Sequence, residues 1–189
     1  MQTSVPSVAD RSTAARRRLA AEVGLALATG LLAALAKRYF DLSIGVPGHS
    51  GLGWVGVLVA GAVVNPRAGM AVLAGASMGV WGIPIGLGHS ALYNTALYGS
   101  ASLALEALRR LRVPLSRAWG AALAGMAVHV VKFGYVLAYS AAAGVLRNFR
   151  VWGAMPALWN HVGFGLGAGL VGWAAARGLV PALRRTRWR

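Results

Sequence analysis

The sequence contains no cysteine, which excludes disulfide bonds and metal sites built from thiolates. Charge is also scarce: 12% of the residues are charged, whereas a soluble domain has about a quarter. Too few charged side chains remain to cover a water-facing surface. The chain instead has 57% hydrophobic residues and a mean hydropathy of +0.60, which predicts an integral membrane protein.

Acidic residues are the scarcest charges, with four against 19 lysines and arginines, and the net charge is +15. Such an excess is typical of nucleic-acid-binding proteins when the basic side chains form one patch or stripe. Here the basic residues separate long apolar runs, so they mark the loops of a membrane protein and predict no nucleic-acid partner. The acidic residues are Asp10, Glu22, Asp41 and Glu106.

Apolar runs predict an all-α integral membrane protein, a compact bundle of about six transmembrane helices, because about 20 residues cross a bilayer. The predicted helices cover about residues 19–39, 51–64, 68–81 or a little beyond, 90–108, 118–143 and 156–176, between basic ends at 1–18 and 177–189. The second helix is short for a bilayer, so it either starts inside the preceding loop or is tilted and buried. Residues 82–88, which include Pro84, are expected to be irregular.

The distribution of lysine and arginine predicts the orientation of this bundle. With both termini in the cytoplasm, fourteen of the 19 basic residues lie inside and four lie outside, which satisfies the positive-inside rule. The outside residues are Lys37, Arg38, Arg147 and Arg150. The remaining one, Lys132, lies within the fifth predicted helix.

Small residues recur every four positions along the first predicted helix, at Ala26, Gly30 and Ala34. Such a stripe lets two helix backbones approach closely in a membrane. It is explained either by packing inside the bundle or by docking to another membrane subunit.

Polar residues gather in the half of the bundle that is predicted to face outward, and burying them in a membrane is costly unless they line a site. His129, Lys132, Tyr135 and Tyr139 share one face of the fifth helix. The cluster predicts a substrate pocket open to the outside. Its candidate residues are Asp41, Trp81, His89, Tyr93, Asn94, His129, Lys132, Tyr135, Tyr139, Asn160 and His161.

Some of these residues have simpler explanations. Trp54, Trp81 and Trp152 are equally well explained as an interfacial aromatic belt. His49 and His89 are explained as loop residues that bond to local backbone.

Lys132 lies about fifteen residues into its helix, deeper than its side chain reaches from the inner end. An ammonium at this depth needs an anionic partner. Asp41 is the only plausible partner within the chain, and otherwise the anionic group of a ligand supplies the counter-charge.

Two segments carry a resemblance to a known family. Gly45-Val46-Pro47 leads into an apolar helix, and the run from Leu58 to Gly69 closes on Asn65-Pro66-Arg67. This pattern resembles the substrate-binding S components of energy-coupling factor (ECF) transporters, in which a Leu-Ala-Gly run closes on a Gly-Pro-Arg turn. Asn65 stands where glycine is usual.

The resemblance implies a bacterial plasma-membrane protein that captures a small water-soluble nutrient, vitamin-like or anionic and aromatic, at its outer face. It would deliver this substrate to a module made of a transmembrane coupling protein and ATPase subunits. The stripe of Ala26, Gly30 and Ala34 would contact the coupling protein. Nothing matches the amino-terminal Met-His motif of the nickel and cobalt members, so no metal is expected.

The chain has no Walker motif, so we expect no enzyme activity, no cofactor of its own, and ATP hydrolysis by its partners. Two alternatives come from other classes of protein. One is a membrane haem protein that uses His129 and His161 as axial ligands. The other is a membrane scaffold that transports nothing.

Overall fold

A computed structural model describes residues 8–40, 46–145 and 153–186, and these residues contain helices and turns but no strand. The predicted all-α class is therefore confirmed for this part of the chain. Three helical stretches are long and apolar enough to cross a membrane, namely Ser12–Tyr39, Ala118–Ala142 and Ala154–Leu179. The helices are α1 (Val8–Tyr39), α2 (Gly51–Val64), α3 (Met70–Ile85), α4 (Ala91–Arg110), α5 (Ala118–Ala142) and α7 (Ala154–Thr186).

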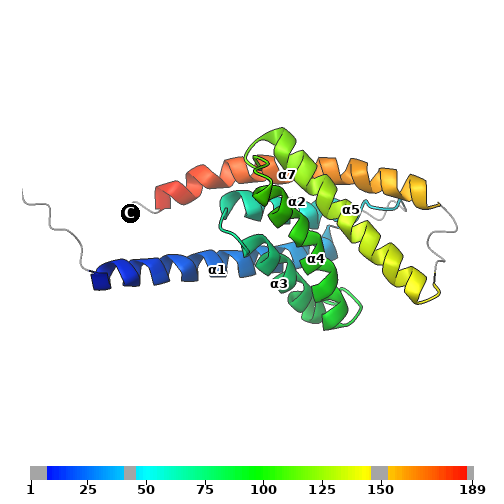
Figure 1. Ribbon diagram of the computed structural model, residues 1–189, viewed down its shortest axis with the longest axis horizontal. Coiled ribbons are helices and arrows are strands. Elements are labelled where there is room, and N and C mark those ends of the chain that lie inside the picture. The colour runs from blue at the N-terminus through cyan, green and yellow to red at the C-terminus, as the bar shows by residue number, and fades with distance from the viewer. Residues whose placement is uncertain (1–7, 41–45, 146–152, 187–189) are drawn as a thin grey trace, which may run out of the picture.

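The helices run alternately in opposite directions, so α1 begins and α7 ends on the same side of the bundle, at the left of Figure 1. We call this side the terminal end, and it also contains the turns at 65–69 and 111–117. The opposite side, the distal end, contains the turns at 46–50 and 86–90.

The shortest helix, α2, lies at the centre of the bundle and contacts α1, α3, α4, α5 and α7. Its 14 residues span about 21 Å, less than the hydrocarbon thickness of about 30 Å. The surrounding helices pack in the order α1, α3, α4, α5 and α7, and within the described residues no Cα atom of α1 lies within 8 Å of one in α7. Of the two explanations for the short second helix, burial is the one that the structure supports.

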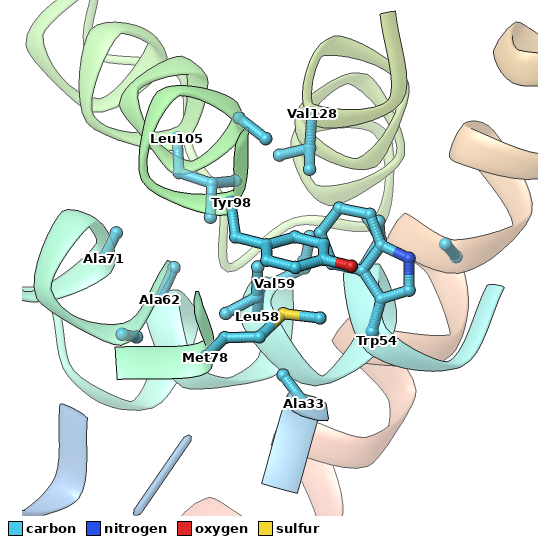
Figure 2. Close-up of a cluster of buried hydrophobic side chains, with 14 of the residues drawn as sticks. Ala33, Trp54, Leu58, Val59, Ala62, Ala71, Met78, Tyr98, Leu105 and Val128 are labelled. Carbon is cyan, nitrogen blue, oxygen red and sulfur yellow. The ribbon is translucent and has the colours of Figure 1, made fainter. Parts of the chain in front are cut away.

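Side chains from several helices meet on α2 to form the core. Trp54 and Leu58 of α2 and Met78 of α3 are at most 1% exposed. Figure 2 shows the rings of Trp54 and Tyr98 beside one another, next to Met78 and Val128. The core therefore joins α2 to α3, α4 and α5.

Glycines allow the closest helix contacts. A Cβ added at Gly125 of α5 would overlap the Gly165 carbonyl oxygen of α7, and one added at Gly172 of α7 would overlap the Gly56 carbonyl oxygen of α2. These contacts bring α7 against both α5 and α2, as expected for membrane helices that pack through small residues.

The small-residue stripe of α1 is used inside the bundle. Ala26 is 3% exposed and Ala34 is 0% exposed. A Cβ at Gly30 would lie 2.6 Å from the Ser77 Cβ and 2.7 Å from the Met78 backbone nitrogen, both in α3. The prediction that this stripe docks a partner subunit is therefore wrong, because α3 covers it. The alternative, packing within the bundle, is confirmed.

The terminal end of α2 is closed by a side chain from α4. The Arg109 guanidinium donates to the backbone carbonyls of Ala62 (2.9 Å), Asn65 (3.2 Å) and Arg67 (2.8 Å). It also pairs with the buried Glu106 at 3.4 Å. Arg109 thus satisfies the Ala62 carbonyl, which the end of the helix leaves without an intrahelical partner, and ties the turn after α2 to α4.

Three helix boundaries differ from the prediction by more than two residues. α1 begins at Val8 instead of residue 19, since the preceding segment is rich in alanine and arginine, which favour helix. α3 continues through Pro84 to Ile85 and ends only at Gly86, which adopts the left-handed conformation at φ 75°. α7 continues past residue 176 to Thr186.

Candidate functional site

Four aromatic side chains from four helices meet between the centre and the distal end of the bundle. They are Trp54 of α2, Tyr98 of α4, His129 of α5 and His161 of α7, and we call them the inner cluster. The ring centroids are 5.2 Å apart for Trp54 and Tyr98, 6.2 Å for Trp54 and His129, and 5.7 Å for His129 and His161. None of the four residues is more than 7% exposed.

Several polar atoms of the inner cluster make no hydrogen bond of full geometry with the described residues. They are Nε1 of Trp54 and both ring nitrogens of His129, although the His129 ring lies against the Gly51 backbone, its one weak partner among the described residues. Leaving such groups buried and unpaired costs free energy, about 1–3 kcal/mol for each group. An arrangement of this kind calls for an explanation, and a bound molecule that supplies the missing partners is one.

His161 differs because its Nδ1 bonds to the Ala157 carbonyl oxygen at 2.7 Å. A carbonyl only accepts, so Nδ1 carries the proton, and in the neutral ring Nε2 is an acceptor. The inner cluster therefore offers an indole donor, an imidazole with one donor and one acceptor, and a second imidazole acceptor.

The turn at 46–50 and the start of α2 cover the two histidines. A Cβ at Gly51 would overlap the His129 ring, and one at Gly48 would lie 3.3 Å from Nδ1 of His161. Gly48 also has a φ of 94°, a conformation that favours glycine. Nδ1 of His49 bonds to the Val46 carbonyl, so its explanation as a loop residue is confirmed. Glycines thus let the turn lie directly on the cluster.

Lys132 is half-buried one turn beyond His129 on α5 and acts electrostatically on both His129 and His161. Phe133 covers the other side of His161, with ring centroids 4.9 Å apart. A positive charge therefore lies beside the inner cluster, as the sequence predicted. Asp41, its proposed internal partner, lies outside the described residues, as do Arg147, Arg150 and Trp152.

A second aromatic group, the outer cluster, lies nearer the distal end. Its centre is Tyr93, whose ring is 4.4 Å from His89, 5.6 Å from Tyr135 and 4.7 Å from Tyr139. His89 and Tyr139 are exposed, whereas Tyr93 and Tyr135 are half-buried. The predicted face of α5 therefore leads from the exposed outer cluster to the buried inner one.

Three predicted site residues do not join either cluster. Asn94 is 1% exposed and donates to the Gly88 carbonyl at 2.8 Å, so it fastens the turn between α3 and α4. Trp81 is 42% exposed on the outside of α3, which agrees with the belt explanation. Asn160 is half-buried beside His161 but lies about 100° around the helix from it.

Two residues of the inner cluster were not predicted. For Trp54 the interfacial belt was one of two explanations, and its complete burial shows that explanation to be wrong. Tyr98 carried a usable signal, because Asn94, Tyr98 and Ser102 follow one another at intervals of four and all three are buried. A polar face at this spacing on an apolar helix indicates a buried polar layer.

Within the described residues, no group of three or more histidine, aspartate or glutamate side chains is placed to hold a metal ion. Comparisons with protein-family models, with curated proteins and with solved structures find no match for this chain.

Proposed function

We propose that this chain is the substrate-capture subunit of an ATP-driven uptake system. It crosses the plasma membrane as a bundle of about six helices with both termini in the cytoplasm. The observation that carries the proposal is the inner cluster, in which buried polar atoms of Trp54 and His129 make no hydrogen bond of full geometry with the described residues, apart from a weak approach of His129 to the Gly51 backbone. A captured nutrient would supply those partners.

The chemistry of the cluster favours a small planar anion as the ligand. Trp54 and Tyr98 provide aromatic surface, and Trp54 and His129 provide hydrogen-bonding atoms. Lys132 provides a positive charge beside both histidines, which favours a carboxylate or phosphate group. Aromatic surface, directional hydrogen bonds and one charge are the usual components of a small-molecule site.

Access to the site runs from the distal end in this proposal. The exposed outer cluster of His89, Tyr93, Tyr135 and Tyr139 lies at the entrance. The turn at 46–50 lies over the histidines, so a ligand that reaches His129 from this side displaces the turn and the start of α2. The structure thus corresponds to a closed arrangement in which the site is shielded from water.

Delivery requires partners, namely the coupling protein and ATPase subunits that the resemblance over Gly45 to Gly69 implies. Because α3 covers the stripe of Ala26, Gly30 and Ala34, the coupling protein would bind another face of the bundle. Two exposed leucines on α1, Leu19 and Leu27, which lie about 80° apart around the helix, offer such a face.

Native mass spectrometry of gently purified protein tests the proposal. We expect the wild-type protein to retain a small anionic molecule, and Trp54→Phe and His129→Leu to lose it. Trp81→Phe is the matched control, because this tryptophan is exposed and lies outside both clusters. Retention of the same mass by Trp54→Phe and His129→Leu would remove the inner cluster from the ligand site.

The haem alternative is favoured by one observation, the 5.7 Å separation of the His129 and His161 rings. Absorbance spectroscopy of the same preparation decides between the two functions. A Soret band that disappears in His129→Leu would identify a haem protein. The scaffold alternative predicts neither a Soret band nor a retained molecule.

A further inference from the structure

An apolar groove runs between α1 and α7, with α2 as its floor. It encloses about 360 Å³ and is lined by side chains such as Leu25 and Leu32 of α1, Val57 of α2, and Val171 and Leu179 of α7. Thr29 is the one polar residue in its lining, and the Thr29 hydroxyl is already bonded to the Leu25 carbonyl at 2.8 Å. Since the Cα atoms of α1 and α7 stay more than 8 Å apart in the described part of the chain, the groove opens sideways between them.

A polar pocket of about 590 Å³ adjoins this groove at the terminal end. The two share Leu25 and Val64 in their linings, so they lie next to each other. The pocket is lined by Arg18 and Glu22 of α1 and by Asn65 and Arg67 from the turn after α2. We call it the basic pocket.

The charges of the basic pocket are held in place by short contacts. Glu22 pairs with Arg18 at 3.0 Å and with Arg67 at 2.8 Å, which leaves one net positive charge. The Asn65 amide donates to the Glu22 backbone carbonyl at 2.8 Å, and this ties the turn to α1. Each guanidinium has five N–H donors, of which Glu22 occupies only some. Since the Arg18 and Arg67 side chains are 76% and 48% exposed, their other donors are accessible to an anion.

We propose that the groove and the basic pocket together bind one anionic membrane phospholipid. The phosphate lies at Arg18 and Arg67, and an acyl chain lies in the groove along α2. A groove that opens into hydrocarbon is filled by hydrocarbon, and a basic pocket between helices at its end selects an anionic headgroup. The inference depends on the chain lying in a membrane, and it is independent of the nutrient-capture proposal.

Two kinds of variant separate the two halves of this site. Arg18→Gln combined with Arg67→Gln removes the headgroup charges, and Arg110→Gln is its control, since Arg110 is exposed at the same end but outside the pocket lining. Ala175→Phe places a ring in the groove without touching a charge. Ala174→Phe is its control, because Ala174 is exposed on the same helix and lies outside the groove lining.

The experiment titrates full-length protein in detergent with phosphatidylglycerol or phosphatidylcholine and counts bound lipids by native mass spectrometry. We expect one tightly bound phosphatidylglycerol, with an affinity at least tenfold above that of phosphatidylcholine. The double arginine variant should lose roughly tenfold or more of this affinity, as expected for removing two charges at a membrane surface. Ala175→Phe should lose affinity for phosphatidylglycerol as well, and both control variants should bind it with wild-type affinity.

Other outcomes overturn the proposal. Equal binding of the two lipids, or no effect of the arginine variant, would show that no anionic headgroup is recognised. If the arginine variant loses affinity for phosphatidylglycerol and Ala175→Phe does not, the site binds a headgroup or free phosphate, and the acyl chain does not lie in the groove. If the groove instead binds a membrane helix of a partner, the isolated protein holds no lipid in it. Ala175→Phe would then leave lipid binding unchanged.

Discussion

Gly30 of α1 and Gly24 of the same helix provide a matched test of how the bundle packs. A Cβ at Gly30 would lie 2.6 Å from the Ser77 Cβ, whereas ordinary contacts between carbon atoms are about 3.5–4.0 Å. Its other neighbours are backbone atoms of α3, which cannot rotate away. A Cβ at Gly24 would meet nothing within 4 Å.

The expected energies follow from these surroundings. Replacing glycine by alanine within a helix gains about 1 kcal/mol from helix propensity, so Gly24→Ala should stabilise the protein by about that amount. Gly30→Ala has the same gain but must push α1 away from α3, and overpacking of this kind costs about 1–3 kcal/mol. The gain from helix propensity is the same in both variants, so it cancels when their free energies of unfolding are subtracted. The difference in the free energy of unfolding should therefore be about 1–3 kcal/mol, with Gly30→Ala the less stable.

Chemical unfolding of the isolated chain in detergent, followed by circular dichroism, measures this difference. The isolated chain is the right sample, because a stripe that only docked a partner would leave its stability unaffected. If Gly30→Ala is as stable as Gly24→Ala, then α3 does not pack on the stripe, and the stripe is free to dock a partner.

Three further predictions concern the ligand, the turn and the topology. Lys132→Met should weaken binding of the retained ligand by about 2–5 kcal/mol, the usual cost of truncating one partner of a buried charge pair, and calorimetry checks this. Unchanged affinity with a lowered melting temperature would assign Lys132 a structural role. Asn65→Ala should lower the free energy of unfolding by about 1–3 kcal/mol, because it leaves the Glu22 carbonyl without the amide that bonds to it; an unchanged value would contradict this. In intact cells, a cysteine at Arg112 should be shielded from an impermeant thiol reagent and one at Val145 should react, and the reverse pattern would invert the topology.

Local sequence signals predicted the helices well. The bounds of α2 agree with the prediction at both ends, because Asn65-Pro66 stops the helix and glycine begins it. Pro84 misled the prediction for α3, since a proline close to the end of a helix removes only one hydrogen bond and the helix continued to Gly86.

The candidate site was predicted only in part, because spacing shows which residues share a helix face but not what that face meets. The spacing on α5 placed His129, Tyr135 and Tyr139 on one face, which the structure divides between the inner cluster (His129) and the outer cluster (Tyr135 and Tyr139). The same reasoning identified the stripe at Gly30 but could not decide between α3 and a partner as its neighbour. Trp54 was missed because tryptophan at a helix end is common at membrane interfaces, and only the tertiary structure shows it buried.

The short central helix has a consequence for how the protein is made. At about 21 Å, α2 is a poor candidate for entering the bilayer alone during synthesis, whereas the longer α1 precedes it in the chain. The carbonyls of Ala62 and Asn65 at its end receive Arg109, which the ribosome adds more than forty residues later. A nascent chain that stops before α4 therefore leaves the carbonyls at the end of α2 without the side chain that closes them. Stable insertion of α2 should wait for α4, so that insertion and packing of this helix are one step in biogenesis.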